Sequence, residues 1–90
     1  MSGQPAVSGA PGSRLLLVDA GQAKDIFDVV EIADAVVRVR TAFLFELGEE
    51  MNVRLEAGDT TYEASARVRA HVGTGDERIT ELELENRVSV

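Results

Sequence analysis

The stretch MNVRLEAGDTTYEASARVRAHVGTGDERITELELE, residues 51–85, decides the fold of this 90-residue chain. Apolar and polar residues alternate in three segments of it, at about 51–56, 61–71 and 79–85. Such alternation is typical of half-buried strands, and the short glycine-containing polar stretches between the segments favour tight turns. The sequence therefore predicts an antiparallel meander of three strands.

The first half of the chain is less clear-cut. Residues 14–18 form a short apolar run that fits a buried strand. Apolar residues within 24–40 recur at three- and four-residue spacing, which fits a helix capped by Asp25. However, most of the apolar residues from 29 to 41 are β-branched, which favours strands. We prefer two strands, at about 26–32 and 36–42, followed by a loop at 43–50.

Composition excludes several classes of protein. The chain has no cysteine, so disulfides, thiolate zinc sites and cysteine nucleophiles are ruled out. A net charge of −7 argues against binding to a nucleic-acid polymer or an anionic membrane. There is no apolar run of about 20 residues for membrane insertion and no secretion signal, so we expect a cytoplasmic protein. Residues 1–13 are uncharged and rich in Gly, Pro and Ser, which predicts a disordered leader before a single domain at 14–90.

The residues needed for catalysis or metal binding are sparse. His71 is the only histidine, and we expect it on the surface at the end of a strand. Glu81, Glu83 and Glu85 share one face of a strand, but side chains two apart lie about 6.5 to 7 Å from each other, too far to share one small ion. We therefore expect no enzyme activity and no metal site.

Two blocks of sequence, residues 30–41 and 47–55, carry a resemblance to a known family. The first is a charged turn followed by a valine-rich strand, and the second opens a strand with Gly-Glu. With the alanine-rich strand at 63–70, these blocks resemble the PilZ domain, a bacterial receptor for cyclic di-GMP. The resemblance implies an all-β fold, a small antiparallel six-stranded barrel.

The resemblance also implies ligand-binding positions, which are degenerate here. PilZ domains contact the nucleotide through R-x-x-x-R and D-x-S-x-x-G motifs. The second motif corresponds to Glu31, Ala33 and Val36, and Arg14 is the sole candidate for the first. Ala33 has no hydroxyl to offer and Val36 adds bulk where glycine allows close approach. We expect cyclic di-GMP binding to be lost or very weak, and we expect no other cofactor.

Two further groups of residues are candidates for binding. Arg38, Arg40, Arg67 and Arg69 would form a positive patch for an anion or a partner if their two strands were neighbours; alternatively, they pair with acidic residues on a solvated face. Phe43 and Phe45 either plug one end of the barrel or form an exposed apolar contact for a partner or a second copy.

These observations favour a non-enzymatic signalling or adaptor module of PilZ type that acts through protein–protein contacts. The resemblance implies a role in bacterial motility, pilus function or surface behaviour. One alternative is a cyclic di-GMP receptor with altered site geometry, in which Arg14 acts with Arg38 or Arg40. Another is a small dimerisation domain with a helix at about 24–40. The expected partner is a protein, with homo-oligomers as a further option.

Overall fold

The structure, a computed structural model, describes residues 13–89 and is almost entirely β-sheet. In that range the elements are β1 (Arg14–Asp19), β2 (Gln22–Lys24), β3 (Asp28–Ala33), β4 (Val36–Arg40), β5 (Glu50–Ala57), β6 (Thr60–Val72), the 3₁₀ helix η1 (Gly75–Glu77) and β7 (Ile79–Ser89). The expected leader, residues 1–13, lies outside the described residues except for Ser13.

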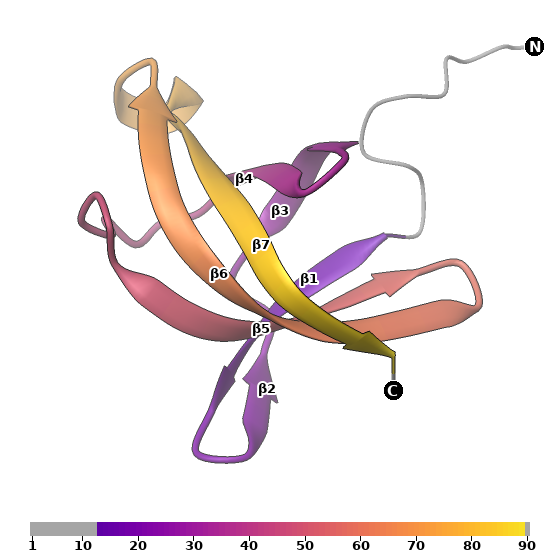
Figure 1. Cartoon of the computed structure of the whole chain (residues 1–90). Coiled ribbons are helices and arrows are strands. Elements are labelled where there is room, and N and C mark those ends of the chain that lie inside the picture. Colours follow the sequence, from indigo (N-terminus) through magenta and orange to yellow (C-terminus); the bar gives the residue numbers. More distant parts are fainter. Residues whose placement is uncertain (1–12, 90) are drawn as a thin grey trace, which may run out of the picture.

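The strands form one antiparallel sheet in the order β2-β1-β5-β6-β7-β4-β3. Figure 1 shows that the sheet curls strongly, so that its two halves face each other like an incomplete barrel. β1 and β3 contact each other although they are not paired, which brings the two halves together on the open side. The all-β prediction is confirmed, and so is the meander, because β5, β6 and β7 are consecutive neighbours.

Two sequence predictions about the first half need correction. The helix considered for residues 24–40 is wrong, because β3 and β4 occupy this segment as a hairpin. The expected six strands are seven in the described chain, since β1 turns back into the short strand β2. Ala20 and Gly21 make that turn with φ angles of 53° and 79°, and positive φ at both central residues is typical of tight hairpin turns.

The core lies on the inner, concave face of the sheet. Its buried residues come from β1, the β2–β3 link, and β4 to β7: Leu15, Phe27, Val37, Val39, Val53, Leu55, Ala64, Ala66, Val68, Leu82 and Leu84. Except for Leu15 and Phe27, these are the apolar members of the alternating segments, so the alternation places one side of each of those strands inside and the other in solvent.

A β-bulge in β6 changes which side chains face inward. The pairing with β7 shifts between Val68 and Ala70, so that two residues of β6 oppose one residue of β7. After the bulge, His71 pairs with Thr80, which is 1% exposed on the inner side of β7. The expectation that His71 is a surface residue is therefore wrong: it is half-buried and points inward.

Two kinds of feature are absent from residues 13–89. No helix there has the length and apolar character that crossing a bilayer requires. The same range also contains no group of three or more His, Asp or Glu side chains placed to hold a metal ion.

Candidate functional site

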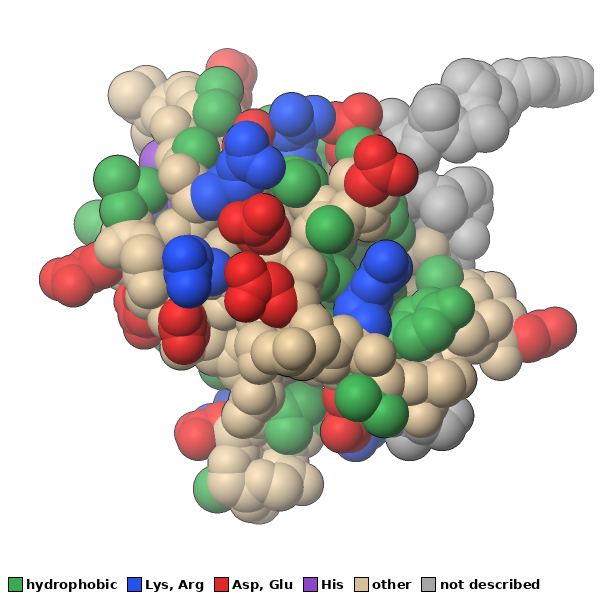
Figure 2. Space-filling view, viewed as in Figure 1, with side chains coloured by type: hydrophobic (Ala, Val, Ile, Leu, Met, Phe, Trp, Pro, Cys, Tyr) green, Lys and Arg blue, Asp and Glu red, His purple; other side chains and the backbone are tan. Residues whose placement is uncertain are grey.

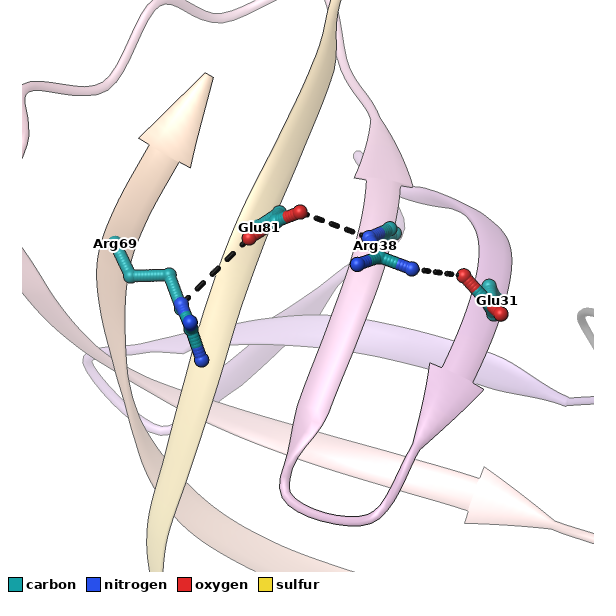
Figure 3. A network of polar contacts seen from close by, with 4 residues as sticks. All are labelled: Glu31, Arg38, Arg69 and Glu81. Atoms are coloured by element: carbon teal, nitrogen blue, oxygen red, sulfur yellow. Dashed lines mark hydrogen bonds and ion pairs between the residues drawn. The ribbon is translucent and has the colours of Figure 1, made fainter. Parts of the chain in front are cut away.

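A network of ion pairs crosses the convex face of the sheet (Figure 3). Glu81 on β7 accepts a hydrogen bond from Arg38 Nε on β4 at 2.8 Å and lies 3.6 Å from Arg69 Nε on β6. Arg38 also donates to Glu31 on β3. The network therefore links four adjacent strands, and the side chain of Glu81 is only 12% exposed.

The ion pairs of the network favour the charged form of Arg38. Its pKa is raised above the usual value, first by the hydrogen bond to Glu81 and then by the hydrogen bond to Glu31. A raised pKa means that the guanidinium contributes to stability throughout the range below its ordinary pKa, and that this contribution is lost only in stronger alkali. Arg38 is therefore a permanent cation held between two carboxylates.

The four arginines considered as a positive patch are divided by acidic residues. β7 lies between β4 and β6, so the two strands that carry these arginines are not neighbours. Arg67 pairs with Glu50 at 3.1 Å, and its register partner on β7 is Glu83. Arg40 is exposed and forms no ion pair with another residue of 13–89. Figure 2 accordingly shows blue and red side chains interleaved on this face.

The positions that the PilZ resemblance implies are also engaged within the chain. Arg14 pairs with Asp25 at 3.1 Å and with Glu56 at 3.6 Å, while Glu31 pairs with Arg38. Ala33 and Val36 face each other across the β3–β4 hairpin, and neither carries a polar side chain. The structure thus brings Glu31, Ala33 and Val36 onto one hairpin and directs the arginine of β1 to other carboxylates.

One end of the barrel exposes large apolar side chains. Five such residues are exposed in the described chain, and four of them belong to the loop between β4 and β5 or to the end of β6: Phe43 (54%), Leu44 (71%), Leu47 (66%) and Val72 (53%). We call these four residues the apolar end. Hydrophobic side chains protrude from this side of the molecule, at the upper left of Figure 2.

Hydrogen bonds brace the loop of the apolar end against the sheet. His71 Nε2 lies 2.8 Å from the carbonyl oxygen of Phe45, and because a carbonyl only accepts, Nε2 is the donor. His71 Nδ1 is 3.1 Å from the hydroxyl of Thr80. The backbone of Gly48 donates to Val68, and Val68 donates to Glu49. Arg78 adds a contact of 3.4 Å to the carbonyl of Phe43.

The two phenylalanines of this loop have different environments. Phe45 packs against the core, with its ring 5.9 Å from that of buried Phe27. The ring of Phe43 lies 6.2 Å from Phe45 on the outer side and is half exposed. Phe45 thus occupies the plug position considered from the sequence, whereas Phe43 occupies the exposed one.

A cleft of about 780 Å³ adjoins the apolar end. Its lining comes from the β2–β3 link, the end of β4 and η1, and includes Asp25, Asp28 and Asp76 together with Arg40 and Arg78. Because the side chains carry both signs of charge, the cleft does not favour an anionic ligand over a cationic one.

Sequence reasoning missed several of these residues. Leu47 and Val72 carry no periodic signal, because one lies in a loop and the other follows the bulge. The role of His71 depends on the same bulge.

Comparisons of the chain with protein-family models, with curated proteins and with solved structures each found no match.

Proposed function

We propose that this chain is a non-enzymatic protein-interaction module that contacts its partner through the apolar end. The observation that carries the proposal is the braced loop, which holds Phe43, Leu44 and Leu47 in solvent, while Val72 is exposed at the end of β6. A flexible loop would let these side chains fold onto the core, whereas hydrogen bonds from His71 and Val68 hold the backbone in place. Clustered exposed apolar side chains in a fixed geometry are typical of binding surfaces.

The kind of module is proposed from the sequence resemblance. A PilZ-type adaptor without strong cyclic di-GMP binding would act through protein contacts in bacterial signalling, with motility, pilus function and surface behaviour as the processes. The internal pairing of Arg14 and Glu31 supports a weakened nucleotide site, because a ligand would have to displace these ion pairs.

Partner capture with matched variants tests the proposal. The full chain, the variant Leu44→Glu and the control Val88→Glu are immobilised, and proteins retained from a lysate of the source organism are quantified. Val88 is 62% exposed on β7, opposite Glu63 and distant from the apolar end, so the control makes the same change elsewhere. We expect partners that bind wild type and Val88→Glu but not Leu44→Glu. Equal retention by all three proteins would contradict the proposal.

Titration calorimetry with cyclic di-GMP tests the alternative function. We expect no binding with a Kd below about 10 μM, since that affinity corresponds to about 7 kcal/mol and the site lacks one arginine, the serine and the glycine. Tighter binding would favour a receptor with altered geometry, in which Arg14 acts with Arg38 or Arg40.

A further inference from the structure

The acidic residues around the apolar end have no basic partners within the described residues 13–89. Its loop carries Glu46 and Glu49, and the β6–β7 turn carries Asp76 and Glu77. None of the four forms an ion pair with another residue within 13–89. We call them the acidic rim. The Glu49 carboxylate accepts a hydrogen bond from the Glu46 backbone, which leaves its charge uncompensated.

The rim differs from the convex face in that none of its carboxylates is paired. On the convex face, Glu31, Glu50, Glu63 and Glu81 each lie within ion-pair distance of an arginine, whereas Glu83 and Glu85 form no ion pair within residues 13–89. Two basic residues lie near the rim: Arg78, whose guanidinium contacts the carbonyl of Phe43, and Arg40, which lines the same cleft as Asp76. Four acidic and two basic residues leave this end with a local charge of −2.

We infer that the apolar end binds a segment of a partner protein whose apolar side chains are flanked by Lys and Arg. This inference rests on the proposed function and adds the chemistry of the partner. Apolar side chains of the segment would cover Phe43, Leu44 and Leu47, while its cations would meet the acidic rim. Charge complementarity of this kind speeds association and selects the partner.

Other occupants fit the surface less well. A second copy bound through the same surface would bring two acidic rims together, and each copy carries a net charge of −7. An anionic membrane would be repelled by the same charges. Neither a second copy nor an anionic membrane would place basic groups opposite the acidic rim.

The test uses two synthetic amphipathic peptides of about 18 residues, roughly five helical turns. Both have the same leucine face, and the polar face is Lys in one and Glu in the other. Each peptide is titrated into the full chain, and the Kd and the positions of shifted backbone amides are measured by NMR. We expect the Lys peptide to bind at least about tenfold more tightly at low salt, with the preference shrinking as salt screens the rim. The largest shifts should fall at residues 43–49 and 72–78.

Two charge variants separate the rim from the overall charge of the protein. Glu46→Gln combined with Asp76→Asn removes two charges from the rim. Glu85→Gln combined with Asp59→Asn removes two charges from exposed positions elsewhere, so both double variants have the same net charge. We expect the rim variant to weaken binding of the Lys peptide roughly three- to tenfold. The control should stay near wild type, and Leu44→Glu should weaken binding further than Val88→Glu does.

Each outcome decides between the inference and the proposed function. Equal binding of the Lys and Glu peptides, or equal effects of the two double variants, would overturn the basic partner and leave the apolar end as a binding surface. Failure of both peptides to shift residues 43–49 would also overturn the inference, while partner capture tests the proposed function independently. A dimer that Leu44→Glu converts to a monomer would identify a second copy as the occupant and overturn the inference.

Discussion

The convex face and the apolar end of this barrel are both exposed, yet they differ in whether their charged side chains form ion pairs within the chain. On the convex face, Arg38, Arg67 and Arg69 each pair with a glutamate of the same chain. At the apolar end, neither the apolar side chains nor the acidic rim is matched to a group within the described chain. The comparison teaches that an abundance of charge does not by itself mark a binding surface. We base the proposed surface instead on exposed apolar side chains whose acidic neighbours form no ion pair within residues 13–89.

Among the changes proposed, Phe45→Ala is expected to have the largest effect on the free energy of unfolding, because it removes the side chain that anchors the loop of the apolar end to the core. Phe45 packs on the core beside Phe27, so its truncation should lower the free energy of unfolding by about 3 kcal/mol. Phe43→Ala, on the half-exposed neighbour, should cost less than about 1 kcal/mol. Urea denaturation of the two variants measures the difference. Equal losses would mean that both rings are structural and that Phe43 does not belong to a free surface.

His71→Ala removes the brace without changing the apolar residues. It leaves the carbonyl of Phe45 and the hydroxyl of Thr80 without their partner, which should cost about 1 to 3 kcal/mol. We also expect faster amide exchange in the loop at 43–49 than in wild type, measured by hydrogen–deuterium exchange. His71→Gln, which keeps a side-chain donor, serves as the control and should restore part of the protection. Unchanged exchange in His71→Ala would show that Val68 and Arg78 brace the loop without the histidine.

Glu81→Gln tests whether the ion-pair network on the convex face stabilises the fold. Glu81 accepts from Arg38 and lies close to Arg69, so loss of its charge should lower the urea midpoint slightly, by a few tenths molar, and high salt should shrink the difference. Glu85→Gln on the same strand is the control, because Glu85 is exposed and forms no ion pair within residues 13–89. A Glu81 effect no larger than the Glu85 effect would mean that the network adds nothing to stability.

Leu44→Glu should have the smallest effect on the fold. Leu44 is 71% exposed, so the free energy of unfolding should stay within about 0.5 kcal/mol of wild type. Circular dichroism and urea denaturation of Leu44→Glu and Val88→Glu check this expectation. A large loss of stability in Leu44→Glu would place Leu44 in the structural plug and remove it from the binding surface.

Most of the strands could be predicted from the sequence because alternation and β-branching are local signals. The segments at 51–56, 61–71 and 79–85 alternate and became β5, β6 and β7. β2 could not be predicted, since its three residues are all exposed and bury no apolar side chain. The place of β4 in the strand order was equally hidden: nothing in the alternation indicates that β7 separates β4 from β6, so the sequence left open whether four arginines share a patch.

The candidate site was predictable only in part. The apolar run at Phe43 and Phe45 stood out because it lies between strands, but alternation assigns no inner side within a loop. The roles of Phe43 and Phe45 diverge because His71 and Val68 fix the loop backbone from a distant strand. Long-range contacts of this kind leave no local pattern in the sequence.

The bulge in β6 gives the strand one residue that it can lose without turning its end over. A deletion of Arg69 would remove the extra residue between Val68 and Ala70 and restore an uninterrupted ladder with β7. His71 and Val72 would keep Thr80 and Ile79 as their register partners, so His71 would still face inward and Val72 would still face solvent. A deletion of Arg67, inside the regular ladder, would instead move Val68 from the core to the outer side of the sheet.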